Sequence, residues 1–128
     1  MDKEQVNEWL RDYMAAWESY DPAQVAGLFT DDAEYRYYPY EDAIVGGRAI
    51  ADSWREEGRR DEPNSYKAHY ECVAADGDIA VATGESIYFK PNGSLDDAFD
   101  NCFVMRFASD GRCASFTEYY VKRPAPKP

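Results

Sequence analysis

The chain has 128 residues, and its composition limits the classes of protein to which it can belong. It has 25 acidic and 14 basic residues and a formal net charge of −11, which disfavours nucleic acid or an anionic membrane surface as a partner. The first ten residues hold no apolar signal core, and no window is apolar enough to span a bilayer. We therefore expect a cytoplasmic protein.

The length fits one domain, which we place at residues 1–123, followed by a proline-rich tail at 124–128. The three cysteines, Cys72, Cys102 and Cys113, are odd in number and form no C-x-x-C pair. The sequence therefore predicts neither a disulfide framework nor a metal site, and we expect no cofactor. Aromatic residues make up 16% of the chain, so rings must fill much of the core or line a hollow inside it.

Three helices are predicted in the first half of the chain. Apolar residues at spacings of three and four predict a helix over residues 2–19 with Asp2 as its cap. Its apolar stripe consists of Val6, Trp9, Leu10, Tyr13, Met14 and Trp17. Asp21 followed by Pro22 predicts a second helix that runs through Leu28 and Phe29. A third helix is expected at 48–58, after Gly46 and Gly47, with Gly58 as its stop.

The tyrosine-rich stretch AEYRYYPYED, residues 33–42, is predicted to be extended. Alternation places Tyr35 and Tyr37 on the inner face with Ala33. Tyr38 and Tyr40 are expected at the mouth of the interior or on a contact surface, because Pro39 interrupts the ladder. The interpretations open at this point are a packed strand and the wall of a site.

After residue 64 the apolar period changes to two, which is typical of strands. Tyr66, Ala68, Tyr70, Cys72 and Ala74 share one face, with Lys67, His69 and Glu71 on the other. Turn signals at Asp76-Gly77, Asn92-Gly93 and Asp110-Gly111 separate runs at 79–89, 97–107 and 112–122. The order predicts an α+β fold, a cone-like barrel in which three N-terminal helices pack on a strongly curved, mainly antiparallel sheet.

This order of elements, with the stretches DYMAAWESYDPAQVAGLFTDDAEYRYYP and GGRAIADSW, resembles the nuclear transport factor 2-like superfamily and, within it, the SnoaL-like small proteins. The resemblance covers residues 4–122 and includes Tyr13, LFTDDA at 28–33, Pro39, Gly46 and Ile50. It implies the cone fold. The superfamily contains isomerases, dehydratases, epoxide hydrolases and polyketide cyclases, and also members that only bind or dimerise, so the fold alone names no reaction.

Resemblance to individual enzymes of the superfamily is incomplete. A ketosteroid isomerase would match at Tyr13, but Tyr37 stands where its base carboxylate should lie and Phe103 where its second acid should lie. A scytalone dehydratase has paired pocket histidines, whereas this chain has only His69. An epoxide hydrolase needs an arginine between two inward aspartates, and Arg36 and Arg106 both fall on outward phases. These reactions are therefore disfavoured.

Glu118 is the main candidate for chemistry. In CASFTEYYV alternation directs Phe116, Glu118 and Tyr120 inward, and a desolvated carboxyl has a raised pKa that suits proton transfer. SnoaL-like cyclases resemble this arrangement in having a carboxylate on the late sheet. Tyr13 and Tyr37 are the expected hydrogen-bond donors to a ligand oxygen where charge develops. The alternative is that Glu118 forms a structural pair with an arginine or a tyrosine.

Other polar residues are weighed by their phase in the strands. Asn101 is in phase with Phe103, Met105 and Phe107, so its amide is expected to point inward. There it could hold a ligand oxygen or orient Glu118, and the alternative is an amide whose hydrogen bonds are satisfied near the start of the strand. Glu85 is a secondary inward candidate, in phase with Val81, Thr83 and Ile87 but late in its strand, where curvature can carry it to the rim. His69 shares the polar face and is predicted at the surface or a subunit interface. The expected aromatic and apolar lining comprises Trp17, Tyr35, Trp54, Tyr66, Tyr70, Phe103, Met105, Phe116 and Tyr120, with ordinary core packing as the alternative.

Two classes of function remain open. The first is a cofactor-independent cyclase, isomerase or dehydratase that acts on a small hydrophobic or aromatic carbonyl compound. The second is a binding or dimerisation module without chemistry. In either case we expect a homodimer through the outer sheet face, because that face is semi-apolar. Its residues are Cys102, Val104, Arg106, Ser115, Thr117, Tyr119 and Val121.

Overall fold

The computed structural model describes residues 1–56 and 66–124, without the side chains of residues 55 and 56. Along the chain the elements are α1 (Lys3–Ser19), α2 (Pro22–Gly27), β1 (Phe29–Arg36), β2 (Ile44–Val45), α3 (Gly47–Glu56), β3 (Tyr66–Asp76), β4 (Ile79–Phe89), β5 (Leu95–Phe107) and β6 (Cys113–Lys122). The expected helix stop at Gly58 and most of the expected tail lie outside the described residues.

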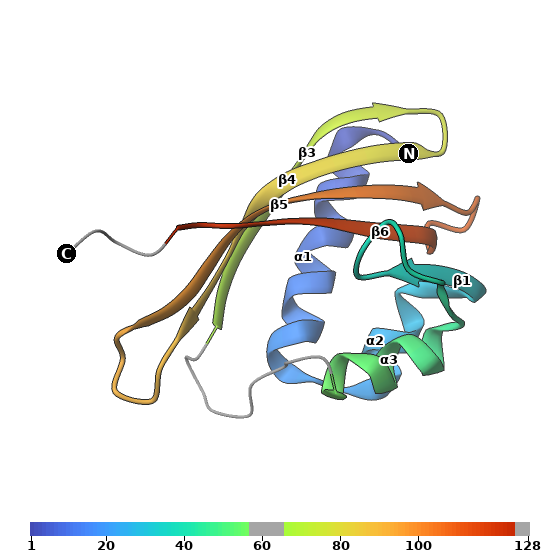
Figure 1. The fold of residues 1–128 in the computed structure, drawn as a ribbon. Coiled ribbons are helices and arrows are strands. Elements are labelled where there is room, and N and C mark those ends of the chain that lie inside the picture. The colour runs from blue at the N-terminus through green and yellow to red at the C-terminus, as the bar shows by residue number, and fades with distance from the viewer. Residues whose placement is uncertain (57–65, 125–128) are drawn as a thin grey trace.

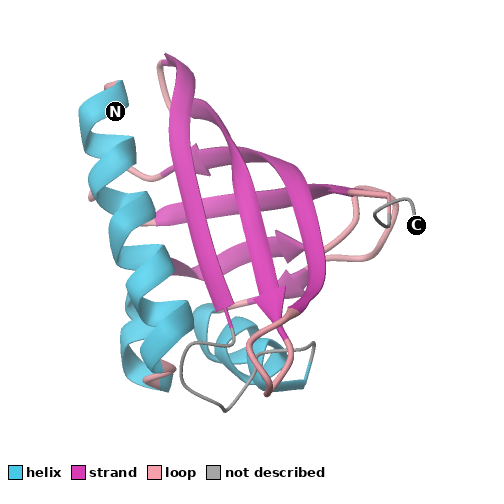
Figure 2. Ribbon diagram, turned by 90° about the vertical axis from the view of Figure 1, so that its left-hand side faces the viewer, coloured by secondary structure: helices cyan, strands magenta, loops and turns pink. Residues whose placement is uncertain are grey.

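Helix α1 begins and packs as its sequence predicts. The Asp2 carboxylate accepts from the Gln5 backbone N–H at 2.8 Å, and the Gln5 side chain accepts from the Asp2 N–H at 2.9 Å, which forms a capping box. One face of the helix is buried, and it consists of Val6, Trp9, Leu10, Tyr13, Ala16 and Trp17. Met14 is half-buried at the edge of this stripe. The stripe places α1 against the concave side of the sheet (Figures 1 and 2).

Six strands form one sheet in the order β2-β1-β6-β5-β4-β3. The neighbours β1 and β6 run parallel, and all other pairs are antiparallel. The strands bend strongly along their length, so the sheet forms a concave surface that α1 crosses, while α2 and α3 lie together at the β1 end (Figure 1). This is the α+β arrangement that the sequence predicts, with helices on one face of a curved, unclosed sheet.

The first strand differs from the sequence prediction at both ends. Helix α2 ends at Gly27, and Phe29 already belongs to β1, which ends at Arg36. The reason is the parallel ladder, because Phe29 is paired with Cys113 of β6, and this tertiary contact overrides the local helical pattern. Tyr35 therefore lies inside the strand, Tyr37 lies just beyond it, and the short strand β2 was not anticipated.

The inward phase of β4 is opposite to the one predicted. The sequence prediction placed Val81, Thr83, Glu85 and Ile87 inward, yet the residues in phase with buried Ala80, Ala82 and Ser86 face the interior. Small residues occupy the inner face of β4 because rings from the neighbouring strands meet over it. Large apolar side chains were therefore a misleading guide to which face of β4 is buried. In β3 a bulge between Cys72 and Ala74 also reverses the phase, so that Ala75 rather than Ala74 packs against the core.

Gly84 is where the rings of β3 and β5 meet across β4. It is paired with Tyr70 on one side and Asn101 on the other. The Tyr70 ring passes over it to stack on Phe103 with ring centroids 4.2 Å apart. A Cβ on Gly84 would lie 2.0 Å from the His69 carbonyl oxygen and 2.6 Å from Cδ1 of Tyr70. Only glycine permits this close approach.

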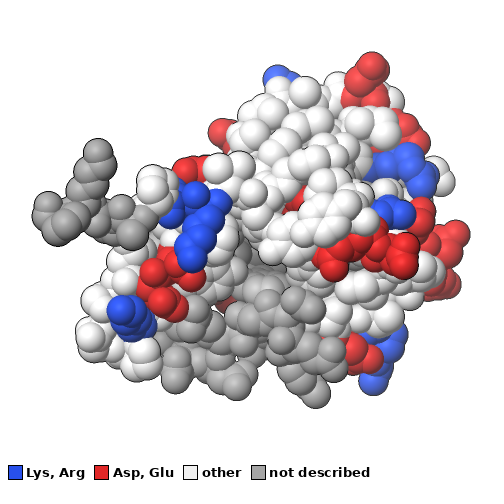
Figure 3. Space-filling view, in the orientation of Figure 1, with Lys and Arg blue, Asp and Glu red and all other residues white. Residues whose placement is uncertain are grey.

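The charged surface gives no sign of a basic patch on the face shown in Figure 3, where lysines and arginines lie beside acidic side chains. Arg112, for example, is paired with Asp110 at 2.7 Å, and Lys122 with Asp97 at 3.1 Å. None of the helices in the described ranges is both long and apolar enough to cross a membrane.

Candidate functional site

Glu118 lies on the inner face of β6 and is 4% exposed. The Tyr35 hydroxyl donates to its Oε2 at 2.8 Å, and the Tyr120 side chain also hydrogen-bonds the carboxyl. The parallel register explains the first contact. Tyr35 is paired with Phe116, two residues before Glu118, and its ring stacks on Phe116 at 4.8 Å. The inward phase of Phe116, Glu118 and Tyr120 is thus the one that alternation indicates.

Tyr13 reaches Glu118 only through Tyr35. The two hydroxyl oxygens are 3.4 Å apart, and because Tyr35 donates its proton to Glu118, Tyr13 is the donor to Tyr35. The sequence interpretation made Tyr13 and Tyr37 the donors to a ligand oxygen where charge develops. In the structure Tyr35 is the direct donor to Glu118, and the Tyr37 hydroxyl lies 3.0 Å from Ser53 Oγ. The result is a chain of hydrogen bonds from α1 through β1 to the carboxyl on β6.

Burial determines the acid–base behaviour of this chain. Desolvation raises the pKa of Glu118 from 4.5 to about 7, although the hydrogen bonds from Tyr120 and Tyr35 lower it in part. Desolvation, and then the nearby Glu118 charge, raise the pKa of both Tyr13 and Tyr35 well above the usual range for a phenol. The tyrosines therefore stay neutral donors, while Glu118 exchanges its proton near neutral pH.

The rings behind the carboxyl are close-packed core. Tyr13 stacks on Phe116 at 5.2 Å and meets Trp54 edge-on at 5.2 Å. Most of the predicted lining residues are buried in this cluster, namely Trp17, Tyr35, Trp54, Tyr70, Phe103, Met105 and Phe116. The Trp54 indole N–H is buried and has no hydrogen-bond partner among the described residues. Ordinary core packing therefore accounts for this part of the lining.

A second set of rings is only half-buried. Of the predicted residues it contains Tyr37, Tyr66 and Tyr120. Tyr88 and Phe99 also belong to it, and the contacts run from Tyr66 to Tyr88 at 5.2 Å, then to Phe99 at 6.0 Å, then to Tyr120 at 6.0 Å. Sequence reasoning missed Tyr88 because it assigned the wrong phase to β4. Small inward residues at Ala80, Ala82 and Gly84 were the available signal.

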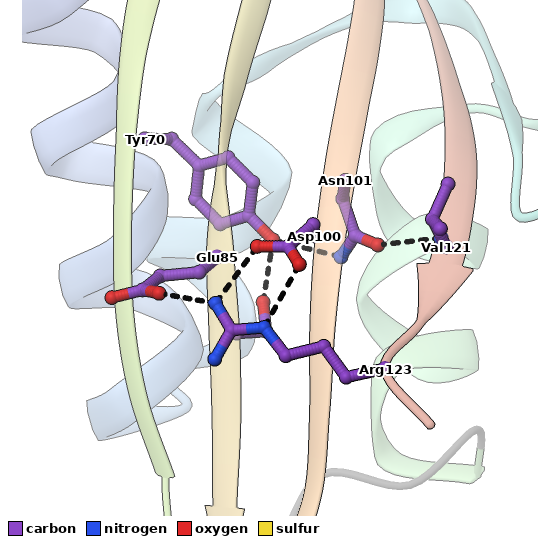
Figure 4. A network of polar contacts seen from close by, with 7 residues as sticks. Tyr70, Glu85, Asp100, Asn101, Val121 and Arg123 are labelled. Atoms are coloured by element: carbon purple, nitrogen blue, oxygen red, sulfur yellow. Dashed lines mark hydrogen bonds and ion pairs between the residues drawn. The ribbon is translucent and has the colours of Figure 1, made fainter.

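Asn101 is buried on the inner face but does not contact Glu118 in any bond described. Its Nδ2 donates to the Tyr70 hydroxyl at 2.9 Å, and its Oδ1 accepts from the Val121 backbone N–H at 3.3 Å (Figure 4). The Tyr70 hydroxyl is 2.5 Å from Ser86 Oγ. These bonds favour the interpretation of a satisfied structural amide that ties β3, β5 and β6 together.

Glu85 lies on the outer face of the sheet, contrary to its prediction as an inward residue. It pairs with Arg123 at 2.6 Å, and Arg123 also binds Asp100 at 2.8 Å (Figure 4). His69 is exposed on the same face, directly opposite Glu85 in the ladder, as the alternation of β3 indicates. Tyr40 is 82% exposed and stacks on Tyr38, which in turn contacts Tyr120 at 5.3 Å.

The described part of the chain contains no group of three or more His, Cys, Asp or Glu side chains placed to hold a metal ion. What the arrangement offers is a buried carboxyl with neutral hydroxyl donors, next to half-buried rings. Such a group can accept or release one proton and can accept hydrogen bonds from a ligand.

Removing the Tyr35 hydroxyl should raise the pKa of Glu118 further, because that hydrogen bond favours the ionised carboxyl. For Tyr35→Phe we expect an upward shift of roughly one pKa unit, the size of one hydrogen bond to a charged group. NMR titration of the Glu118 side-chain carboxyl would measure it. Tyr13→Phe is the matched control and should give a smaller shift, since the direct bond remains. Equal pKa shifts in the two variants would contradict an arrangement in which Tyr13 reaches Glu118 only through Tyr35.

The curved sheet, the helices over its concave face and the interior acid define a small α+β protein of the cone type. The SnoaL-like domain matches residues 10–116, so the chain belongs to the SnoaL-like family, within the nuclear transport factor 2-like superfamily. A comparison with curated proteins found no match.

Solved structures with similar folds come from several bacteria. A proposed ketosteroid isomerase from Kribbella flavida DSM 17836 is 18% identical with a TM-score of 0.67, over 99% of this chain and 85% of that chain. An LEH-like epoxide hydrolase from M. tuberculosis is 19% identical with a TM-score of 0.66, over 93% and 84%. A protein from Catenulispora acidiphila is 20% identical with a TM-score of 0.68, over 91% and 89%. At this identity the likeness concerns the fold.

Proposed function

We propose that this protein binds a small hydrophobic or aromatic molecule beside the half-buried rings on the concave side of its sheet, where Glu118 serves as a general acid or base. The observation that carries the proposal is the buried Glu118 carboxyl, which has two phenolic hydrogen-bond partners and a pKa of about 7. A group with a pKa near the working pH is suited to proton transfer. Tyr37, Tyr66, Tyr88, Phe99 and Tyr120 provide ring surface beside it.

Within this proposal each residue has a distinct part. Glu118 takes a proton from the ligand or gives one to it, and Tyr120 stabilises the charge that develops beside the carboxyl. Tyr35 and Tyr13 are positioning residues, because they act through Glu118. A carbonyl compound with an acidic C–H bond is the type of substrate that suits this chemistry, so cyclisation, isomerisation and dehydration are the candidate reactions.

The second candidate is a ligand-binding or dimerisation module that performs no reaction. The observation that favours it is the composition of the interior. Among the described residues, Glu118 is the only buried acidic or basic side chain, so a second acid–base group has to come from the ligand or from water.

A binding screen followed by product analysis tests both candidates. Aromatic polyketide-like carbonyl compounds would be added while tryptophan fluorescence is followed, since Trp17 and Trp54 belong to the aromatic cluster beside the site. Compounds that bind would then be incubated with the protein and with Glu118→Gln. Turnover that is lost in the variant while binding persists supports catalysis. Binding without turnover in either protein supports the second candidate, and an absence of binding across the series contradicts both.

We also propose that the outer sheet face joins two copies of the chain. This face carries exposed apolar side chains, with Tyr119 42% and Val121 63% exposed. A hollow of about 540 Å³ lies beside them and is lined by residues of all four long strands. A second copy would remove these apolar groups from water. Glu85 and Asp100 are paired with Arg123, so these three charges would enter the interface already partnered.

Light scattering should therefore report twice the monomer mass of 14.6 kDa at micromolar concentration. Val121→Lys should shift the equilibrium toward the monomer, because it places a charge in the interface. Val45→Lys is the matched control, since Val45 is similarly exposed at 58% but lies on β2 away from this face. A wild-type monomer would refute the arrangement.

A further inference from the structure

The groups that face Glu118 are all neutral. The titratable ones are Tyr13 of α1, Tyr35 of β1, Tyr66 and Tyr70 of β3, and Tyr120 of β6. On β5 the residue directly opposite Glu118 in the ladder is Phe103. Every lysine, arginine and histidine whose side chain is described is exposed or half-exposed. The two half-exposed ones, Arg36 and Arg112, bind Glu34 and Asp110 instead. Glu118 therefore has no positively charged partner among the described residues.

The hydrogen bonds around Glu118 nevertheless suit its ionised form. The Tyr35 hydroxyl donates to Oε2 at 2.8 Å, and the bonds from Tyr35 and Tyr120 both favour the carboxylate over the carboxylic acid. A buried carboxylate is ordinarily balanced by a positive charge as well as by hydrogen bonds. The described part of the site thus supplies hydrogen-bond donors for a negative charge but no balancing positive charge.

The surroundings of the carboxyl also suit a cation. Aromatic faces attract positively charged nitrogen, and the attraction is strongest where water is excluded. Tyr120 hydrogen-bonds Glu118 and is half-buried, and the half-buried Tyr66 is near enough to interact electrostatically with the carboxyl. Tyr37, also half-buried, packs on Tyr35, which donates to Glu118. The net charge of −11 further raises the local concentration of cations around the molecule.

We infer that the ligand of this site carries a positively charged nitrogen, as an organic amine or quaternary ammonium, which pairs with Glu118 and lies against the surrounding tyrosine rings. The inference rests on the proposed function in one respect, that a small molecule binds beside Glu118 and the half-buried rings. It narrows the ligand class from hydrophobic or aromatic molecules in general to those that also bear a cationic group.

Two probes of the same shape test it. Benzyltrimethylammonium and neopentylbenzene differ in one central atom, nitrogen against carbon, and so in charge. Their dissociation constants would be measured by tryptophan fluorescence at constant ionic strength, at pH 8 and at pH 5.5. We expect the cation to bind at least tenfold more tightly than the neutral probe at pH 8. At pH 5.5 its affinity should fall severalfold, because a proton competes for Glu118, while the neutral probe should change little.

Glu118→Gln should remove the preference for the cation over the neutral probe, and with it the pH dependence of that preference. Glu85→Gln is the matched control. It removes the same charge from the outer face of the sheet and should leave the preference intact. The pH dependence of the wild-type protein keeps the test valid even where Glu118→Gln fails to fold.

Three results would overturn the inference. Equal or tighter binding of neopentylbenzene at pH 8 would do so and would leave the proposed function standing. A preference for the cation that survives in Glu118→Gln would assign it to the acidic surface and not to this site. Failure of both probes to bind at millimolar concentration would count against the inference and the proposed function together.

Discussion

Glu118→Gln is expected to stabilise the protein at pH 8, by roughly 3 kcal/mol in the free energy of unfolding, and to change it little near pH 4.5. The folded pKa of Glu118 is about 7, whereas the ordinary value is 4.5. Between these values the unfolded chain has released the proton and the folded chain still holds it. The free energy of unfolding therefore falls as pH rises through this window, by about 1.4 kcal/mol per pH unit. Glutamine cannot ionise, so the variant lacks this loss.

Urea denaturation of both proteins at intervals from pH 4.5 to 8 measures the difference directly. Glu85→Gln is the control, because it removes one negative charge from an exposed ion pair and should give no comparable gain over this range. A loss of about 3–5 kcal/mol in Glu118→Gln at pH 8 would mean that the carboxylate belongs to a buried charge pair. That outcome would contradict both the acid–base proposal and the cationic ligand.

The position of Glu118 was predictable because its strand has a strong, regular pattern. Phe116 and Tyr120 have the same phase, and a slip of one residue would expose both rings. The Asp-Gly and Asn-Gly turns likewise mark the three connections between β3, β4, β5 and β6. The local sequence pattern was therefore sufficient to predict strand phase and strand ends wherever the tertiary contacts favour the same arrangement.

The partners of Glu118 were harder to predict because they depend on contacts between distant segments. The parallel pairing of β1 with β6 places Tyr35 beside Phe116, and no local signal shows which of several tyrosines receives this position. Tyr13 was chosen by resemblance as a donor to a ligand oxygen, and in the structure its hydroxyl meets that of Tyr35. The order of the hydrogen bonds is a property of the assembled sheet.

The reversed phase of β4 has a related cause. Val81, Thr83 and Ile87 have high strand propensity and were assigned to the interior, but propensity does not determine which face is buried. Neighbouring strands fill the same interior space. The large rings of Tyr70 on β3 and Phe103 on β5 meet over β4, so only small side chains fit on the inner face of β4. Ala82 and Gly84 show this most clearly, although residues this small look least like core in the sequence.

Gly84→Ala should cost about 3 kcal/mol or more in the free energy of unfolding. The added methyl would overlap the His69 carbonyl at 2.0 Å and the Tyr70 Cα at 2.7 Å, and both belong to backbone that is held in the β3–β4 ladder. Overpacking of this kind typically costs 1–3 kcal/mol even where flexible side chains can move away. Here backbone must shift, so the cost lies at or above that range.

The same shift should disturb the interior beyond Gly84. Tyr70 would move off Phe103 and away from the Asn101 amide, which would weaken the bond that joins β3 to β5 at 2.9 Å. Denaturant unfolding and near-ultraviolet circular dichroism would follow stability and ring packing together. Gly27→Ala is the matched control, because a Cβ there meets nothing within 4 Å and the residue ends a helix without a positive φ. It should be neutral or slightly stabilising. A Gly84→Ala protein as stable as Gly27→Ala would contradict the close approach of the β3 backbone and the Tyr70 ring to Gly84.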